Sequence, residues 1–483
     1  MADPGESTPV APATPDAGEA ARGVFCNRTL NMRSIRAVGC DMDYTLIHYD
    51  VERWERRAFE HACERLAELV EGLPALAFDA ELVTRGLILD LELGNVVKAN
   101  RFGYITRAAH GTRLLPHEEQ RGTYSRVWVD LSEPRWVFMN TLFSLSEGCL
   151  FARLIELHDA GQLPGVHGYG AVYDLVRRAL NATHLEGELK AEIAASPERF
   201  VVLDAELPLA LLDLKHAGKR LMVITNSEWS YTRDMMAYAF DRFLPGEMTW
   251  RELFDVVIVQ ASKPGFFEGH APLYEVVDES AGLLRPIAGL GEAGRAFQGG
   301  HARQVEQHLG LSGDEILYVG DHVYADVHVS SQIRRWRTAL VLRELEEEVA
   351  AQAGAAVDQV ELERLMAEKS ALEREQAQQR LTLQRAQGGY AEPAQDPGRA
   401  RARIAELRDG LQALDERIAP LARASGEHLS ARWGPLMRAG NDKSRLARQI
   451  ERYADVYMSR VSNLLRVTPF GYLRAPRGSL PHD

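Results

Sequence analysis

The sequence has few cysteines, no long apolar run and fewer basic than acidic residues. Its four cysteines, Cys26, Cys40, Cys63 and Cys149, form no CxxC pair and no zinc spacing, so we interpret them as reduced thiols. No apolar run approaches the roughly 20 residues of a membrane helix, and residues 1–22 contain no hydrophobic segment typical of a signal peptide. The formal net charge of −13 disfavours binding to nucleic acid polymers. We therefore expect a cytoplasmic protein without a membrane partner.

The composition predicts four segments along the chain. Residues 1–23 are rich in Ala, Pro, Gly, Glu and Thr, which is typical of a disordered tail. Residues 24–344 mix short apolar runs with helical patterns and are expected to form the main domain. Residues 345–425 are rich in Glu, Gln, Arg, Ala and Leu, and residues 426–483 return to a globular composition that should pack on the main domain.

A heptad pattern predicts the structure of residues 345–425. Apolar residues recur there at alternating spacings of three and four, at Ile404, Leu407, Leu411, Leu414, Ile418 and Leu421. This spacing is typical of a coiled coil. Turn-forming residues at Gly388, Gly389, Pro393 and Pro397 interrupt the helical composition. We therefore predict an antiparallel helical hairpin, which serves as a structural or oligomer-forming arm and carries no catalytic group.

Short apolar runs in the main domain predict a sheet. The five candidate strands cover residues 34–40, 220–224, 256–260, 315–319 and 338–342. Near-continuous apolar strands separated by helices are typical of a parallel sheet that is covered on both faces. In such sheets ligands bind beyond the carboxyl ends of the strands. Four of the five runs end at or near polar residues, which predicts one shared site at that edge.

Asp41 and Asp43 directly follow the first candidate strand. On an extended backbone, side chains two residues apart point the same way, so both carboxylates can face one divalent cation. Mg²⁺ prefers oxygen ligands, commonly one or two carboxylates together with phosphate and water. One carboxylate could act as a nucleophile and the other as a proton carrier. Taken alone, the pair also fits a turn or a helix cap.

Polar residues after the other strands favour the catalytic interpretation. Thr225, Asn226 and Ser227 follow the second strand, where a hydroxyl and backbone amides could hold phosphate oxygens. Lys263 follows the third strand and supplies a cation. Asp321 follows the fourth strand and could complete a magnesium site. Each element is ordinary by itself, but their common position at strand ends predicts phosphate chemistry.

These segments closely resemble the four motifs of the haloacid dehalogenase (HAD) superfamily. The matching stretches are DMDYTL, ITNS, the lysine of SKPGFF, and GDHVYAD. The resemblance implies an α/β fold with a Rossmann-like core, and a cap inserted between the first two motifs at roughly residues 50–200. It also implies that Asp41 forms an aspartyl-phosphate and that Asp43 is the general acid and base. Mg²⁺ would be held by the Asp41 and Asp321 side chains and the Asp43 carbonyl.

Within that superfamily the chain resembles the cytosolic purine 5′-nucleotidase family over residues 24–345 and 430–483. The additional shared segments are TRGL from Thr84, GNVVK from Gly94, AHG from Ala109, NTLF from Asn140, WRT from Trp336, SNLL from Ser462 and LPHD from Leu480. The resemblance implies that Thr225 and Lys263 hold the phosphoryl oxygens. Asp326 would support Lys263 or the surroundings of the metal.

The same resemblance assigns candidate contacts to the leaving group. Arg177, His184 and Lys190 match family positions that contact the base or the phosphate. Asn181 stands where the mammalian purine enzymes have an aspartate. An amide both donates and accepts hydrogen bonds, whereas a carboxylate only accepts, so the base preference stays open. Phe143 could stack on a base or simply pack in the core.

The predicted function is therefore Mg²⁺-dependent hydrolysis of purine nucleoside 5′-monophosphates. Phosphotransfer would follow if a second nucleoside replaced water. We expect a homo-oligomer, either a dimer or a tetramer. Two alternatives remain open: a phosphatase for another small phosphate ester, and a non-catalytic interaction protein that uses residues 345–425 to bind a partner.

Overall fold

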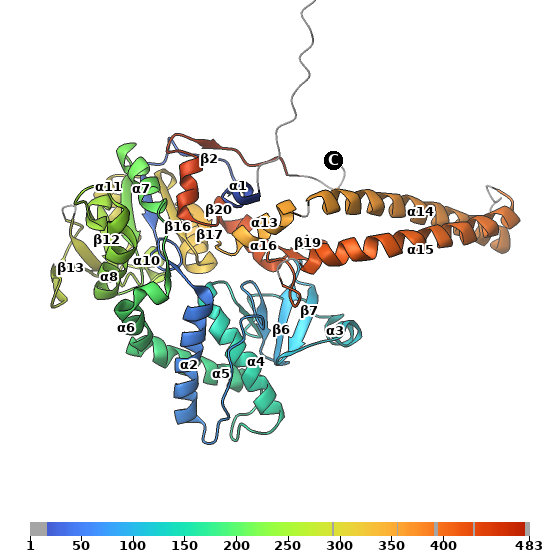
Figure 1. The fold of residues 1–483 in the computed structure, drawn as a ribbon, viewed down its shortest axis with the longest axis horizontal. Coiled ribbons are helices and arrows are strands. Elements are labelled where there is room, and N and C mark those ends of the chain that lie inside the picture. Colours follow the sequence, from blue (N-terminus) through green and yellow to red (C-terminus); the bar gives the residue numbers. More distant parts are fainter. Residues whose placement is uncertain (1–16, 292–293, 355, 391–394, 428–429, 479–483) are drawn as a thin grey trace, which may run out of the picture. The chain divides into compact units, whose positions relative to one another are not determined.

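The computed structural model divides the chain into two compact units (Figure 1). The larger unit contains Arg22–Leu345 and Leu436–Asp483, and the smaller one contains Glu346–Pro435. None of the described helices combines the length and the hydropathy that crossing a membrane requires. The residues that the structure describes are 17–291, 294–354, 356–390, 395–427 and 430–478. Most of the predicted tail and the LPHD segment lie outside them.

The larger unit is built on a ten-stranded sheet. The central strands are parallel, in the order β20 (Val456–Met458), β17 (Arg337–Val341), β16 (Ile316–Gly320), β3 (Ala37–Cys40), β11 (Arg220–Ile224), β12 (Val256–Val259) and β15 (Ala296–Gly299). Antiparallel strands close the two edges, with β1 (Val24–Cys26) at one and β13 (Leu273–Asp278) and β14 (Leu283–Ile287) at the other. The predicted α/β class with a largely parallel sheet is confirmed.

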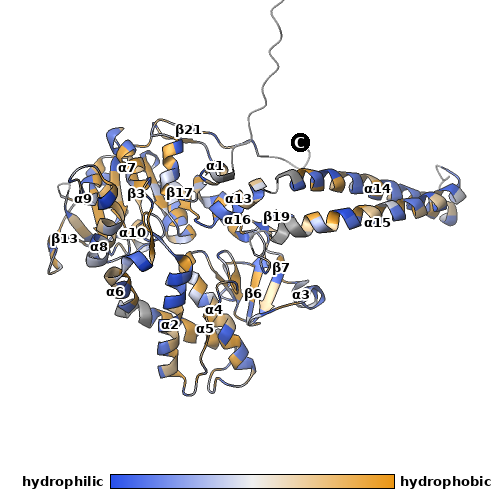
Figure 2. Cartoon of the chain, in the orientation of Figure 1, coloured by the Kyte–Doolittle hydropathy of each residue, from blue (hydrophilic) through white to orange (hydrophobic). Residues whose placement is uncertain are grey.

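Both faces of this sheet are covered by helices, because successive residues of a strand point to opposite faces. On β3, Val38 packs in a cluster that includes Leu211 of α7 (Leu207–His216) and Met235 of α8 (Trp229–Phe240). Ala37 belongs to the opposite cluster, which includes Phe267 of α10 (Gly265–Glu268). The helices α11 (Ala302–Leu309) and α12 (Val329–Arg334) cover that same face. Figure 2 shows hydrophobic residues concentrated on the sheet between these layers.

All five strands predicted from apolar runs form, but two members of the parallel sheet were not predicted. These are β15 and β20, which have only four and three residues. β15 has only two apolar residues in a row and β20 is only three residues long, so neither forms an apolar run that stands out in the sequence. The C-terminal segment therefore does more than pack on the domain surface. It places β20 between β17 and β1, and β21 (Tyr472–Leu473) pairs with β2 (Leu30–Asn31).

A large insertion separates Asp41 from Thr225 in the sequence. It leaves the core after β4 (His48–Tyr49) and returns at β10 (Val201–Val202), and these two strands pair antiparallel. Its helices include α2 (Val51–Leu69), α4 (Leu145–Asp159), α5 (Tyr169–Glu186) and α6 (Glu188–Ala195). It also holds an antiparallel sheet of β8 (Arg113–Leu114), β7 (Ile105–His110), β6 (Asn95–Ala99), β5 (Ile88–Asp90) and β9 (Trp136–Phe138), with α3 (His117–Tyr124) beside β7.

Glu55 is a buried carboxylate inside this insertion. It lies on α2, is 1% exposed, and its Oε2 accepts a 2.7 Å hydrogen bond from the backbone N–H of Ser146 in the first turn of α4. Burial raises the pKa of Glu55 to about 7, and the hydrogen bonds from Ser146 oppose only part of this rise. The native state therefore binds the Glu55 proton more tightly than the unfolded chain does.

We expect Glu55→Gln to stabilise the protein at and above neutral pH. The cost of ionising the buried carboxylate is absent below the unfolded pKa of 4.5 and is complete only above about pH 7. Glutamine avoids this cost and still accepts the Ser146 hydrogen bond, so its advantage should reach about 3 kcal/mol at high pH. Urea unfolding of both proteins near pH 5 and near pH 8 measures the difference. An advantage that does not grow with pH would contradict this assignment.

The smaller unit contains two long helices, α14 (Ala356–Gly388) and α15 (Pro397–Glu427), preceded by α13 (Leu345–Gly354). They run antiparallel, since Lys369 pairs with Asp415 at 2.6 Å and Glu375 pairs with Arg403 at 2.7 Å. Leu365 of α14 packs with apolar residues of α15. All six heptad positions named from the sequence are buried or half-buried on α15. The remaining surface of both helices is mostly hydrophilic (Figure 2).

Candidate active site

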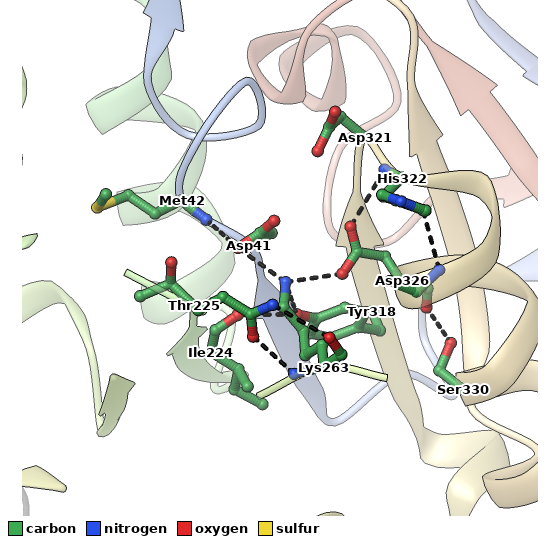
Figure 3. Close-up of polar contacts among 12 residues, drawn as sticks. Asp41, Met42, Ile224, Thr225, Lys263, Tyr318, Asp321, His322, Asp326 and Ser330 are labelled. Carbon is green, nitrogen blue, oxygen red and sulfur yellow. Dashed lines mark hydrogen bonds and ion pairs between the residues drawn. The ribbon is translucent and has the colours of Figure 1, made fainter. Parts of the chain in front are cut away.

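Four neighbouring parallel strands bring the predicted catalytic residues to one edge of the sheet. Asp41 follows β3, and its N–H donates to the Val319 carbonyl of β16 at 2.9 Å. Thr225 follows β11, and its N–H donates to the Ile258 carbonyl of β12 at 2.9 Å. These bonds continue the hydrogen bonding of the sheet one residue beyond β3 and β11. The backbone of Asp41 and of Thr225 is therefore held in place, and this fixes where each side chain begins. Figure 3 shows the cluster that results.

Lys263 lies at the centre of this cluster (Figure 3). Its Nζ lies 2.8 Å from Asp41 Oδ1, 2.7 Å from Asp326 Oδ1 and 3.2 Å from the Tyr318 hydroxyl. The side chain is only 2% exposed. Burial by itself would lower the pKa of Lys263, but Asp326 and Asp41 outweigh it and hold that pKa well above its usual value. Lys263 is therefore a permanent cation beside the Asp41 carboxylate.

The loop that carries Lys263 has an unusual backbone held by Asn226. Gln260 and Ser262 adopt φ values of 44° and 58°, a region that costs energy for residues other than glycine. Asn226 Oδ1 accepts the Lys263 N–H at 2.6 Å, and its Nδ2 donates to the Lys263 carbonyl at 3.1 Å. The Asn226 side chain, predicted to bind substrate, thus holds the lysine loop. The Thr225 hydroxyl accepts the Ser227 N–H at 3.1 Å.

Three carboxylates gather beside Lys263. Oxygen atoms of Asp41, Asp321 and Asp326 all lie within 4.8 Å of one another. Asp326 reaches the cluster from a π-helical turn, η5 (Val323–His328), and its position depends on Gly320. A Cβ at Gly320 would lie 2.4 Å from Asp326 Oδ2, so only glycine leaves room for this carboxylate. The sequence pattern had placed Asp326 beside the site without showing that it joins the other two.

The electrostatics of this cluster suit a divalent cation. Burial raises the pKa of Asp41 to about 7, opposed by Lys263 and increased further by Asp326. Burial likewise raises the pKa of Asp321 to about 8, opposed by Arg85 and increased by Asp326. The rise reflects the cost of holding several negative charges together away from water. A Mg²⁺ ion would offset that cost, and the donor set of oxygens is the one it prefers.

The Asp43 carboxylate lies outside the three-carboxylate cluster. Its Oδ1 accepts the hydroxyl of Tyr49 at 2.5 Å, and its Oδ2 accepts the hydroxyl of Ser227 at 2.5 Å. Ser227 Oγ in turn accepts a 2.7 Å hydrogen bond from Lys190 Nζ, which comes from α6 of the insertion. Ser227, predicted to hold phosphate, and Lys190, predicted to contact the base or the phosphate, are therefore joined to Asp43. Asp43 would reach a cation through its backbone carbonyl.

Two further residues of the insertion contact Asp321, and sequence analysis had given them no role. Thr141 Oγ1 donates to Asp321 Oδ2 at 3.1 Å. The buried Arg85 guanidinium donates to the Asp321 carbonyl, and to the Asn140 carbonyl at 3.2 Å. Both lie in segments already matched by the family resemblance, TRGL and NTLF. That match was the only available signal, because the contacts join residues 180 and 236 positions apart.

The predicted base-contacting residues fall into different surroundings. Arg177 and Asn181 are exposed on α5 and line an open hollow of about 500 Å³, together with Ala171, Asp174 and Arg178. The side chain of His184 lies outside the described part of the structure. Phe143 is half-buried, and its ring packs edge-on against Tyr44 with centroids 4.7 Å apart. Core packing thus accounts for part of the Phe143 surface, and the substrate roles stay predictions.

An α/β sheet whose strand ends hold a partly buried aspartate, a buried lysine paired with it and a three-carboxylate cluster suits phosphate-ester chemistry. A family model described as the 5′ nucleotidase family matches residues 24–483. The chain belongs to that family, which confirms the resemblance stated from the motifs. Family membership supports a phosphoric monoester hydrolase activity, either phosphatase or nucleotidase.

Two curated relatives match almost the whole chain. A 5′-nucleotidase domain-containing protein from Dictyostelium discoideum is 27% identical over 95% of this chain and 74% of its own length. The human 5′-nucleotidase domain-containing protein 2 is 27% identical over 92% of this chain and 81% of its own length.

Solved structures of phosphatases and hydrolases align with part of the chain. A predicted phosphoglycolate phosphatase from Haemophilus somnus is 12% identical with a TM-score of 0.28, covering 64% of this chain and 85% of its own. A HAD-superfamily hydrolase from Geobacter sulfurreducens is 15% identical with a TM-score of 0.26, covering 64% and 87%. At such low scores the family assignment rests on the sequence matches.

Proposed function

We propose that this chain is a Mg²⁺-dependent 5′-nucleotidase that hydrolyses nucleoside 5′-monophosphates, with purine nucleotides as the expected substrates. The observation that carries the proposal is the partly buried Asp41 carboxylate held 2.8 Å from Lys263, with Asp321 and Asp326 beside it. A carboxylate nucleophile must approach a phosphate dianion, and this is feasible only where cations screen the repulsion. Lys263 supplies one positive charge at this point.

Asp41, Asp321 and the Asp43 carbonyl would hold the magnesium ion. When bound, the ion neutralises phosphoryl oxygens and so favours attack. Asp41 attacks phosphorus in line and forms an aspartyl-phosphate, while Asp43 protonates the leaving 5′-oxygen. Asp43 then accepts a proton from the water that hydrolyses the intermediate. A second nucleoside in place of that water would give phosphotransfer.

Lys263 and the loop after β11 would orient the transferred group. Thr225 is buried at the strand end, and Lys263 lies beside it across the edge of the sheet. Asp326 holds the Lys263 amine as well, through the 2.7 Å contact described above. The insertion between residues 50 and 200 would exclude bulk water, since it carries Lys190 and Thr141 to the strand ends.

A panel of phosphate esters tests this function. The purified chain is incubated with IMP, GMP, AMP, pyrimidine monophosphates and sugar phosphates in the presence of MgCl₂, and released phosphate is measured. We expect release from nucleotides, loss of release after chelation of Mg²⁺, and a higher unfolding temperature when Mg²⁺ is added. Release from none of the esters by folded protein would remove the proposal, and so would release confined to sugar phosphates.

The second candidate is a phosphatase for another small phosphate ester. Asn181 supports this second candidate function. Its exposed amide lies in the hollow on α5 beside Arg177 and offers both a hydrogen-bond donor and an acceptor. Such a group suits a wider range of leaving groups than a carboxylate would. The same panel separates the two candidates by comparing kcat/KM for nucleotides and sugar phosphates.

We also propose that the protein is cytoplasmic and forms a dimer or tetramer, and that residues 345–425 are a coiled-coil arm that helps to assemble it. The paired helices α14 and α15 support the arm, because the ion pairs of Lys369 with Asp415 and of Glu375 with Arg403 join them side by side. Light scattering of the full chain measures the assembly. A monomer at micromolar concentration would contradict the oligomer.

A further inference from the structure

Asp43 is held by hydroxyl groups on both carboxylate oxygens. Tyr49 donates to Oδ1 and Ser227 donates to Oδ2, each at 2.5 Å. The two donors come from different parts of the fold, since Tyr49 ends β4 and Ser227 follows β11. Asp43 itself is only 8% exposed. Its carboxylate plane is therefore fixed from two sides rather than left free to rotate.

The chemistry of the donors fixes the direction of the whole hydrogen-bond chain. The Tyr49 hydroxyl carries a single proton, and it donates that proton to Asp43 Oδ1. The Tyr231 hydroxyl, 3.0 Å from that of Tyr49, must then donate to Tyr49. On the other side, Lys190 donates to Ser227 and Ser227 donates to Asp43. Donors thus run toward Asp43 from both ends, and each bond strengthens the next.

The Tyr49 ring is locked by its neighbours. Its centroid lies 4.3 Å from that of Trp54 and 5.3 Å from that of Tyr44. Tyr49 is 3% exposed, Trp54 is 2% exposed and Tyr44 is 2% exposed. A ring packed this closely cannot swing, so its hydroxyl stays in one place. The aromatic cluster therefore fixes the position of the Tyr49 hydroxyl that donates to Asp43.

We propose that Tyr49 is a positioning residue for the acid–base aspartate, and that Tyr231 sets the direction of the Tyr49 hydroxyl proton. The inference rests on the proposed function. In the first step the bond between phosphorus and the leaving 5′-oxygen breaks, a bond from Asp41 to phosphorus forms, and the proton of Asp43 passes to the leaving oxygen. In the second step the oxygen of a water molecule bonds to phosphorus, the bond from Asp41 to phosphorus breaks, and Asp43 takes a proton from that water, so that phosphate leaves and Asp41 is free again. Both transfers need Asp43 within hydrogen-bond reach in one orientation, which Tyr49 maintains.

The test compares two leaving groups in the variant Tyr49→Phe. The alkoxide of a nucleoside needs a proton as it leaves, whereas 4-nitrophenolate leaves without one. We expect kcat/KM for the nucleoside monophosphate that wild type cleaves fastest to fall about 10- to 100-fold, because well-placed general acid catalysis contributes about 10²- to 10⁴-fold. We expect kcat/KM for 4-nitrophenyl phosphate to fall less than about 3-fold. Equal losses for both substrates would overturn the inference, since general damage to the site does not distinguish leaving groups.

Two more variants complete the test. Tyr231→Phe should show the same preference for the nitrophenyl ester with a smaller loss, and it decides the question if Tyr49→Phe does not fold. Tyr44→Phe is the matched control, because Tyr44 packs in the same cluster and its buried hydroxyl has no hydrogen-bond partner among the described residues. Its two kcat/KM values should stay at the wild-type level. Thermal unfolding reports whether each variant is folded.

The outcomes separate this inference from the proposed function. Wild type that releases phosphate from neither substrate would remove the proposed function. Wild type that is active, combined with a uniform loss or no loss in Tyr49→Phe, would remove only the role of Tyr49. A selective loss in Tyr231→Phe as well as in Tyr49→Phe supports the complete chain.

Discussion

Asp41→Asn is expected to reduce phosphate release by about 10⁴-fold or more, the scale seen when a nucleophile is removed from an enzyme. The amide cannot form the acyl-phosphate, and the remaining residues can only bind the ester. The substitution keeps the size of the side chain and removes a carboxylate whose pKa burial raises to about 7, so the fold should tolerate it. Activity of Asp41→Asn near the wild-type level would show that Asp41 is not the nucleophile.

A chemical readout makes this prediction sharper than activity alone. The protein is mixed with a substrate that carries a labelled phosphate, and the reaction is stopped with acid during turnover. Wild type should then retain label on the protein, and Asp41→Asn should retain none. Asp255→Asn provides the matched control. Asp255 precedes β12 at the opposite edge of the sheet and accepts the Leu221 N–H at 2.9 Å. Its turnover per folded molecule should equal that of wild type, although its stability should fall.

Lys263→Met is expected to lose activity and stability together. The amine lies between Asp41 and Asp326 with contacts of 2.8 Å and 2.7 Å, and it is almost fully buried. Removing one partner from a buried ion pair typically costs about 3 to 5 kcal/mol, because the carboxylates left behind are uncompensated. The loss of a preorganised cation should lower kcat by about 10²- to 10³-fold. Urea unfolding and kcat of the folded fraction measure the two effects.

Lys219, another buried lysine, provides the control for the stability that is lost when any buried amine is removed. Lys219 is 6% exposed and donates to the carbonyls of Met32 and Ile35 at 2.6 Å and 2.7 Å. It neighbours no catalytic carboxylate. Lys219→Met should therefore destabilise the protein while kcat per folded molecule stays unchanged. If Lys263→Met behaved in the same way, Lys263 would be a structural residue only.

The predicted parts of the fold are those that local pattern determines. Each apolar run of about five residues formed a strand, because an uninterrupted apolar stretch must be buried on both faces. The strands β15 and β20 escaped prediction because β15 has only two apolar residues in a row, β20 is three residues long, and both join the sheet through partners far along the chain. Sequence order also hid the fact that β20 lies between β17 and β1.

The candidate site divides in a similar way. Asp41, Thr225 and Asp321 were predicted because each directly follows a strand, and parallel strands carry their final residues to one edge. The hydroxyl chain around Asp43 was not predicted, because Tyr231 is 182 residues from Tyr49 and no spacing connects them. Asn226 was predicted to bind substrate, and that stays a prediction; that its side chain also holds the Lys263 backbone only the folded loop could show.

The sequence by itself determined the class of fold, the family and the residues at the strand ends. These follow from short apolar runs, and from the polar motifs after them, which are local features of the chain. Tertiary structure decided which carboxylates lie together: Asp326 joins Asp41 and Asp321, whereas Asp43 turns to Tyr49 and Ser227. The physical reason is that direction and distance between side chains depend on packing. A π-helical turn, a glycine without a Cβ and an aromatic cluster set those directions here.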